Sequence, residues 1–453
     1  MSIIYFDITD ITQFARRSTT LTGIQRVEFN LINLLVRKHG GNSIRCVFFH
    51  PLRQVYLEFD PAERLDDDEF NAERLLSDLG LTRHSERFPS RVRIKGYLRA
   101  NARNKWQRIW MKSWIYAMAW FSPARLDALG LAPVPMKGRQ VAVALRTMGQ
   151  LPAGAHLVHL GSSWFFPETW EFAALHKARG GDVVQFIHDL IPVTHPQFMP
   201  AKEPPIFVNW LERALDYATR FPCNSQWTAE DLQRFIAARR DPSGLHVVPL
   251  AHEFIGAVRN SDPAVPERVL DLPSRGYVLC VGTIEARKNG LSLLQAWRQL
   301  YSELGNALPL LVFAGRFGKI GGEAVRQYIE RHPDLTARVR VVDGPSDQVM
   351  AWLYRNCLFS TYPSHVEGWG LPVGESAWFG RYCVASHASS IPEVCGDLAG
   401  YVDPNDVASI KAGLRLPLTD SGYLLEKEAA IASAKLRTWQ DVADELYDFI
   451  YGW

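Results

Sequence analysis

Short apolar runs without alternation recur along the chain, and stretches of helical length separate most of them. Such runs are typical of strands that are buried on both faces of a parallel sheet. The pattern predicts strands at residues 3–6, 46–49, 141–144, 156–160 and 183–187 in the first half, and at 277–281, 310–314, 339–342, 358–362 and 382–385 in the second. Because strand and helix patterns alternate in both halves, we expect an α/β protein with two doubly wound domains.

Prolines mark the expected boundary between the two domains. Pro263, Pro266 and Pro273 follow the apolar run at 245–249, and proline interrupts regular elements. We therefore predict an N-terminal domain at residues 1–255 and a C-terminal domain at 256–430. The remaining segment, 431–453, contains an amphipathic helix with its apolar side chains on one face, namely Trp439, Val442, Leu446 and Phe449.

The most informative stretch of the second half is a glycine-rich turn between two carboxylates, Glu367-Gly-Trp-Gly-Leu-Pro-Val-Gly-Glu375. A predicted strand precedes this turn and a helical pattern continues after it. Gly368 and Gly370 can adopt positive φ and let a ligand approach the main chain, and the N-terminus of a helix attracts anions. Ionised carboxylates accept hydrogen bonds from hydroxyl groups. The turn therefore suits a diphosphate with attached hydroxyls, as in a nucleotide sugar.

Composition and cysteine usage argue against several other classes of protein. Apolar residues make up 47% and charged residues 22% of the 453 residues, which is ordinary for a globular protein. The six cysteines form no CxxC pair, so we expect reduced thiols in a cytoplasmic protein. The start of the chain turns acidic too early for a signal peptide, and no apolar run reaches the length of a membrane span.

An acidic run around Asp66-Asp-Asp68 is the candidate for an Asp-x-Asp metal motif. It has no buried strand before it, and runs of like charge usually form an exposed face. We therefore expect no metal site, and protein cations are the alternative means of balancing a diphosphate.

Residues 83–112 carry ten lysines and arginines and a single acid, Glu86, although the net charge of the chain is only +2. This asymmetry predicts an anionic partner for the segment. We place the segment in an insertion of the N-terminal domain at about residues 83–125.

Three tryptophans within this insertion, Trp106, Trp110 and Trp114, share one helix face. Cations around an aromatic face are typical of a helix that lies on a membrane surface. Residues 91–121 are therefore a candidate for attachment to an anionic inner leaflet. The alternative is that the tryptophans pack on the first domain. Nucleic-acid binding is disfavoured, because no nucleic-acid motif accompanies the charge.

Several motifs of the chain resemble those of retaining glycosyltransferases of family 4. The Glu-x7-Glu stretch resembles the donor signature of that family, and Val281-Gly-Thr-Ile-Glu-Ala-Arg-Lys-Asn289 resembles its diphosphate-binding strand and loop. Further segments resemble its first loop, its acceptor-side strand end and a downstream helix entry, at residues 22–27, 187–192 and 389–404. The resemblance does not extend to about residues 50–150.

The resemblance implies the GT-B fold, in which two Rossmann-like domains face each other across a cleft and the terminal helix crosses back to the first domain. It also implies roles for single residues. Glu367 would contact the transferred sugar, Glu375 the ribose, and Arg287 with Lys288 the diphosphate. The catalytic candidates are Glu367, His188, Lys288 and Arg287; the acceptor-side candidate is Asp189; the donor-binding candidates are Gly23, Gly282, Thr283, Gly368, Trp369, Gly370, Leu371 and Glu375.

Each candidate also has a plainer interpretation. The helix dipole favours carboxylates in a first helical turn, where we expect Glu375. Adjacent cations are common on surfaces, glycine is a common helix cap, and a strand-end histidine can be a core residue. The chain departs from the family at Thr283, where many members carry an arginine. The charge balance therefore depends more on Arg287, Lys288 and backbone amides.

The sequence predicts a metal-independent, retaining glycosyltransferase that uses a nucleotide-diphosphate sugar and no separate cofactor. The resemblance favours enzymes of bacterial O-antigen or other surface polysaccharides, with mannose or a deoxymannose from a GDP-sugar and a glycan or lipid-linked acceptor. Two alternatives are a sugar-nucleotide epimerase or phosphorylase on the same architecture, and a non-catalytic nucleotide-sugar-binding protein. The complete set of Glu367, Glu375 and Lys288 argues against the non-catalytic alternative.

Overall fold

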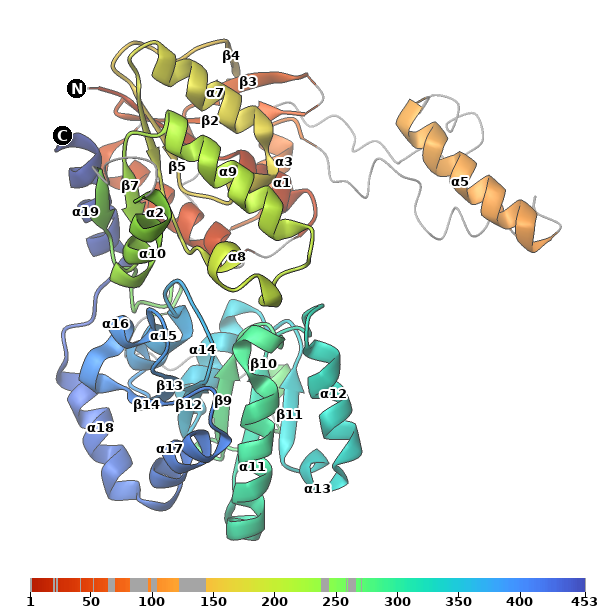
Figure 1. Cartoon of the computed structure of the whole chain (residues 1–453), viewed down its shortest axis with the longest axis vertical. Coiled ribbons are helices and arrows are strands. Elements are labelled where there is room, and N and C mark those ends of the chain that lie inside the picture. Colours follow the sequence, from red (N-terminus) through yellow and green to blue (C-terminus); the bar gives the residue numbers. More distant parts are fainter. Residues whose placement is uncertain are drawn as a thin grey trace. The chain divides into compact units, whose positions relative to one another are not determined.

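The structure of the protein is a computed structural model (Figure 1). It describes residues 2–452 apart from 19–20, 22, 41, 52, 64–69, 82–96, 99–103, 122–143, 238–243, 258, 260–265 and 270. The predicted strand at 141–144, the acidic run at 66–68 and most of the basic segment therefore lie outside the described residues.

The chain divides into two compact units, Met1–Val183 and Val184–Trp453. Within the second unit, hydrogen bonds connect a residue near its start to residues near the end of the chain. The buried Arg220 donates to the carbonyl oxygens of Phe449 and Ile450 at 2.7 and 2.8 Å. The division thus falls earlier than the proline pattern suggests, and the domain limits at 1–255, 256–430 and 431–453 remain predictions.

The first sheet has the strand order β4-β3-β2-β1-β5-β6. Its described strands are β1 Ile4–Asp7, β2 Ile44–His50, β3 Val55–Phe59, β4 Arg146–Met148, β5 His156–His159 and β6 Asp182–Gln185. The β1 strand pairs in parallel with β2 and β5, as the apolar runs predict. The pairs β2–β3 and β3–β4 are antiparallel, which the sequence analysis did not predict. The β2–β3 connection is too short for a parallel crossover, so these strands form a hairpin.

Helices of the first unit are α1 Thr9–Ala15, α2 Ile24–His39, α3 Ala72–Asp78, α5 Lys105–Phe121 and α7 Pro167–Ala178. The α2 helix is amphipathic, and it buries Val27, Leu31 and Leu35 on one face. Gly23 precedes α2 with φ of 50°, a conformation that glycine adopts at little cost.

The second sheet has the order β11-β10-β9-β12-β13-β14, and all of its pairs are parallel. Its strands are β9 Tyr277–Val281, β10 Leu310–Ala314, β11 Val339–Val342, β12 Phe359–Tyr362, β13 Cys383–Ser386 and β14 Gly400–Val402. Five of these six were predicted from apolar runs. The short β14 was not, since a three-residue strand leaves too little pattern.

Helices flank this sheet on both sides in Figure 1, which makes it doubly wound as predicted. The second unit as a whole contains the helices α8 Ile191–Thr194, α9 Glu203–Tyr217, α10 Gln226–Ile236, α11 Gly290–Leu304, α12 Gly322–Arg331, α13 Pro333–Thr336, α14 Asp347–Asn356, α15 Leu371–Trp378, α16 Ile391–Cys395, α17 Val407–Thr419, α18 Ser421–Ser433 and α19 Trp439–Tyr451. The same unit contains the parallel pair β7 Phe221–Cys223 and β8 Leu245–Val247.

The strand order of the second sheet reverses between β9 and β12. The chain runs from β9 outward to β10 and β11, and then returns to β12 and continues outward on the other side. In an open α/β sheet, ligands bind outside the carboxyl ends of the strands at such a switch point. The loops that follow β9 and β12 are the ones that carry Lys288 and Glu367.

All six cysteines are buried free thiols. Cys46 lies in β2 of the first unit, and the other five, at 223, 280, 357, 383 and 395, lie in the second. Burial raises the pKa of the Cys280 thiol, as it does for the other buried thiols of this sheet. The expectation of buried, reduced thiols agrees with this arrangement.

Candidate donor-binding site

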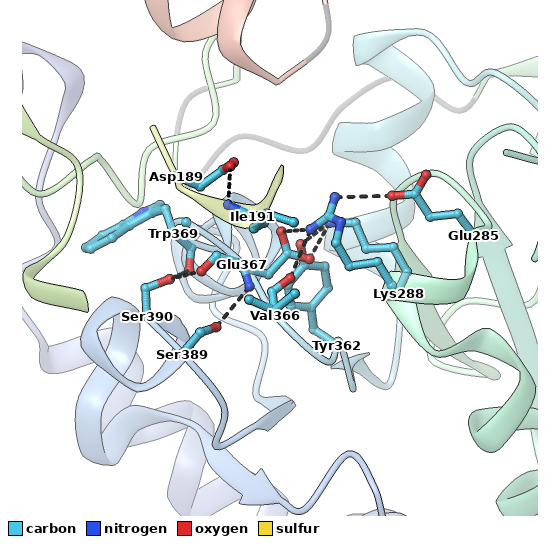
Figure 2. A network of polar contacts seen from close by, with 12 residues as sticks. Asp189, Ile191, Glu285, Lys288, Tyr362, Val366, Glu367, Trp369, Ser389 and Ser390 are labelled. Carbon is cyan, nitrogen blue, oxygen red and sulfur yellow. Dashed lines mark hydrogen bonds and ion pairs between the residues drawn. The ribbon is translucent and has the colours of Figure 1, made fainter. Parts of the chain in front are cut away.

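Glu367 occupies the centre of a charged cluster at the switch point of the second sheet (Figure 2). Its side chain is 7% exposed. One carboxylate oxygen accepts from Arg287 Nη1 at 2.5 Å and the other from Lys288 Nζ at 2.6 Å. Burial alone would raise the pKa of Glu367, but the two cations outweigh burial and lower the pKa to about 2. Glu367 is therefore ionised at neutral pH.

Lys288 has a second partner that the sequence analysis did not identify. Its Nζ lies 2.5 Å from the hydroxyl of Tyr362, the last residue of β12, and 4.7 Å from the centre of the Tyr362 ring. Burial lowers the pKa of Lys288, and the neighbouring Glu367 carboxylate opposes this effect. In the sequence Tyr362 belongs to an apolar strand, and nothing there distinguishes it from a core residue.

Arg287 connects the two loops of the switch point. It donates to the carbonyl oxygen of Val366 at 3.0 Å and pairs with Glu285 at 3.2 Å, besides its contact with Glu367. Burial acts against the charge of Arg287, but Glu367 more than compensates and raises the pKa of the guanidinium. Asn289, the residue after Lys288, connects this loop to two others: its side-chain amide donates to the carbonyl oxygens of Pro363 and Pro404 at 3.1 and 2.6 Å.

Two serines brace the main chain of the glutamate loop from the opposite side (Figure 2). The backbone N–H of Glu367 donates to Ser389 Oγ at 2.9 Å. Ser390 Oγ donates to the carbonyl oxygens of Glu367 and Trp369 at 2.9 and 3.1 Å. Ser389 has φ of 53°, which is uncommon for a residue other than glycine. The sequence analysis quoted these serines as part of a motif, but it did not assign them to the site.

The two glycines of the turn have different reasons to be glycine. Gly370 caps α15 with φ of 119°, as predicted. Gly368 was also expected to use positive φ, and this expectation is wrong. A Cβ at Gly368 would lie 2.0 Å from the carbonyl oxygen of His188, so the absence of a side chain permits close backbone contact with the strand end at 188–189.

Glu375 lies 6% exposed within α15, where one of its oxygens accepts from the hydroxyl of Tyr354 at 2.7 Å. The helix starts at Leu371, and its first turn contains no acidic residue. The expected dipole role of Glu375 is therefore wrong, because the residue lies one turn too far along the helix. Its predicted contact with the ribose remains a prediction.

His188 and Asp189 lie beside the glutamate loop, in the same unit. Asp189 accepts from the backbone N–H of Ile191, the first residue of the short helix α8, at 3.0 Å. Burial raises the pKa of Asp189, against an opposing effect of Arg287. His188 is 7% exposed and its ring lies 4.8 Å from that of Phe186. The acceptor-side roles of both residues remain predictions.

The remaining donor candidates are distributed over both units. In the second unit, Gly282 directly follows β9, has φ of 129° and lies against the Lys288 side chain, and Thr283 comes next. Trp369 is 5% exposed, and among the described residues its indole N–H has no hydrogen-bond partner. Gly23 belongs to the first unit, so its contact with a donor stays a prediction.

A search of the described residues finds no group of three histidine, cysteine, aspartate or glutamate side chains that could hold a metal ion. The acidic run at 66–68 lies outside those residues.

Residues 268–437 match the family model described as glycosyl transferases group 1. Over 286 residues the chain is 27% identical to the O-antigen chain mannosyltransferase B of Escherichia coli, covering 63% of this chain and 71% of that protein. It is 26% identical over 260 residues to the serotype-specific mannosyltransferase WbdA of E. coli, of which it covers 31%. The chain thus spans most of the first relative and under a third of the second.

Two solved structures share the fold at low sequence identity. The Anabaena protein HepE in complex with UDP aligns over 100% of both chains with a TM-score of 0.56 and 13% identity. A trehalose-phosphate synthase from Burkholderia vietnamiensis aligns over 82% of this chain and 84% of its own, with a TM-score of 0.53 and 12% identity.

The fold and the matched domain together define the class: a GT-B fold that contains a group 1 glycosyltransferase domain. The chain contains a group 1 glycosyltransferase domain in its second half and is similar to O-antigen mannosyltransferases of E. coli. The family resemblance and the fold class predicted from the sequence motifs are confirmed. Among the described helices, none is long and apolar enough to cross a membrane.

Proposed function

We propose that this protein is a retaining glycosyltransferase that uses a nucleoside diphosphate sugar and requires no metal ion. The observation that supports it best is the pair of partly buried cations, Arg287 and Lys288, around Glu367. Glu367 pairs with both cations and Glu285 pairs with Arg287, so two carboxylates balance the two positive charges before a ligand binds. The cations lie beside the N-terminus of α15, where backbone N–H groups add partial positive charge. Such a site favours a diphosphate without a divalent cation.

In the proposed reaction, the bond between the anomeric carbon and the leaving phosphate oxygen breaks while the acceptor hydroxyl attacks from the same face of the sugar and passes its proton to that departing oxygen. Lys288 and Arg287 stabilise the charge that develops on the departing diphosphate. Glu367 accepts hydrogen bonds from the sugar hydroxyls and fixes the donor's orientation. His188 orients the acceptor hydroxyl.

The donor that we propose is a GDP-sugar carrying mannose or a deoxymannose, on the basis of the similarity to E. coli mannosyltransferases. The acceptor is a glycan or lipid-linked oligosaccharide of a bacterial surface polysaccharide. The reaction takes place in the cytoplasm, at the inner face of the membrane where a lipid-linked acceptor is accessible.

The test is a transfer assay with the full chain, a panel of nucleotide sugars including GDP-mannose and UDP-glucose, and an oligosaccharide acceptor. We expect a new glycoside with the anomeric configuration of the donor, as read by NMR, and unchanged rates in EDTA. An inverted product contradicts retention, and activity lost in EDTA but restored by manganese contradicts metal independence. An isomerised donor, or a sugar phosphate formed from free phosphate, indicates the epimerase or phosphorylase instead.

A variant separates catalysis from binding. Glu367→Gln is expected to lose most turnover, whereas binding of the nucleoside diphosphate, measured by calorimetry, persists because the cations remain. The matched control is Glu426→Gln, which replaces an exposed carboxylate on α18. Full activity of Glu367→Gln overturns the assignment of Glu367. Binding of nucleotide sugars by the wild-type protein without any turnover identifies a non-catalytic binding protein.

A further inference from the structure

Helix α5 carries the two most exposed large apolar side chains of the described residues. Trp106 is 79% exposed and Trp110 67% exposed, and Ile109 between them is 49% exposed. These residues have the spacing i, i+3, i+4 and therefore share one side of the helix. Ile115 lies half a turn away from Trp106 on the helical wheel and is fully buried. The side that carries Trp106, Ile109 and Trp110 is therefore exposed and apolar, whereas Ile115 is covered.

Cations occupy the opposite side of the helix. Arg108 and Lys112 are exposed on α5 and lie about 200° and about 240° from Trp106 on the helical wheel. The helix sequence contains no aspartate or glutamate. The sequence on its N-terminal side continues this charge, since residues 83–104 hold seven lysines and arginines against one acid. An apolar side with tryptophan and a polar side with cations are typical of helices that lie at the boundary between lipid headgroups and acyl chains.

Length and charge exclude a spanning role for α5. Its 17 residues cover roughly 25 Å, which is shorter than the hydrocarbon core of a bilayer. The helix also carries cations within its length, and no described helix qualifies as a membrane span. A helix of this composition lies in the plane of the interface.

We propose that α5 is a lipid-binding helix that seats Trp106, Ile109 and Trp110 in the headgroup region of an anionic membrane, while Arg108 and Lys112 on its polar side are attracted by the negative surface potential of that membrane. The apolar side chains supply burial, and the cations select anionic lipid. The inference deepens the proposed function, on which it rests for the lipid-linked acceptor. The enzyme would then encounter such an acceptor at the membrane surface to which α5 binds.

The experiment is co-sedimentation of the full chain with vesicles of phosphatidylcholine alone or with one third phosphatidylglycerol, at low and high salt. We expect binding to the anionic vesicles at low salt and its loss at high salt. Each cation at the surface contributes about five-fold in partitioning, so Arg108→Gln/Lys112→Gln should bind roughly thirty-fold more weakly. Trp106→Ser/Trp110→Ser should lose binding at least as strongly.

Matched controls replace exposed residues of the same types elsewhere in the first unit. Phe165→Ser removes an aromatic side chain that is 46% exposed, and Lys177→Gln/Arg179→Gln removes two exposed cations of the α7 region. Both controls should bind vesicles like wild type. Equal loss in the control and α5 variants, or equal binding to both vesicle types, overturns the proposal.

Further measurements on the same variants would detect two other partners of α5. If wild type forms oligomers that the tryptophan variants do not form, and ignores vesicles, the apolar side is a protein interface and the proposal fails. If it binds RNA but not vesicles, the charge serves nucleic acid and the proposal fails as well.

Transfer to a soluble oligosaccharide without vesicles keeps this test separate from the proposed function. The α5 variants should retain that activity. Vesicle binding without transfer would leave α5 a lipid helix and refute the enzyme assignment, whereas transfer without vesicle binding would do the reverse.

Discussion

At the residue scale, Lys288 is held in place by its contacts with two other side chains. Its ammonium group is buried, and burial lowers its pKa, yet it is held between the carboxylate of Glu367 and the hydroxyl of Tyr362. The charge is thereby fixed in place before a donor arrives. Preorganised charge of this kind stabilises a developing negative charge without reorganisation during the reaction.

We predict that Lys288→Met lowers kcat/KM for transfer by about 100- to 1,000-fold, the typical cost of removing one stabilising group. Methionine is similar in length but carries no charge. The measurement is steady-state transfer with varied donor. Lys435→Met, at an exposed position before α19, should leave kcat/KM unchanged. A loss of less than ten-fold in Lys288→Met would contradict the role of Lys288.

Glu28 in α2 is a second buried ionisable group, but one without a charged partner among the described residues. It is fully buried, and among the described residues neither carboxylate oxygen has a hydrogen-bond partner. A Cβ at Gly161 would lie 2.3 Å from Glu28 and 2.7 Å from Asp10, so this glycine makes room for both carboxyl groups. Burial raises the pKa of Glu28 well above its usual value, and the neighbouring Asp10 adds to the effect.

This raised pKa predicts a pH-dependent stability. The folded state keeps a proton on Glu28 that the unfolded chain releases above its own pKa of about 4.5, so stability falls as pH rises from there toward the folded pKa. Glu28→Gln removes that loss. Its melting temperature relative to wild type should rise between about pH 5 and about pH 8. A constant difference over this range would mean that Glu28 does not titrate in this way.

At the scale of elements, the sequence pattern was reliable where a strand is buried on both faces. The run 277–281 is β9 itself, and 310–314 is β10. The pattern did not predict strand β3, which pairs with β2 in an antiparallel hairpin. A hairpin depends on the connection between the strands rather than on their apolar content. Strand pairing at a sheet edge is therefore harder to predict than strand identity at its centre.

The turn at Gly368 permits a test at this scale. We predict that Gly368→Ala destabilises the protein by roughly 1–3 kcal/mol, the usual cost of overpacking, because its Cβ would meet the carbonyl oxygen of His188. Transfer activity should fall as well, since Glu367 is the preceding residue. Thermal unfolding and kcat/KM are the measurements.

The control is Gly149→Ala, where a Cβ would meet nothing within 4 Å. This variant should melt like wild type. An unchanged melting temperature in Gly368→Ala would show that the loop shifts freely and does not depend on contact with residues 188–189.

At the scale of the whole molecule, the sequence identified both doubly wound halves and the residues of the charged cluster. Two motifs of the sequence, each in a loop, identified Glu367, Arg287 and Lys288. It missed Tyr362 and Tyr354, whose contacts join residues 74 and 21 positions apart in the chain. Partners of this kind are set by packing, and a local pattern contains no record of them.

The distribution of cysteines between the units provides an internal reporter of opening. A thiol reagent reaches a buried sulfur when the surrounding structure opens, and Cys46 is in the first unit while Cys280 lies in β9, next to the donor loop of the second. We predict that a saturating nucleoside diphosphate slows alkylation of Cys280 in mild denaturant, read by peptide mass spectrometry, and leaves Cys46 unaffected. Equal protection of both would show that the ligand stabilises the two halves together. The alkylation rates of two native cysteines can thus show, without added labels, which of the two units is stabilised by a ligand.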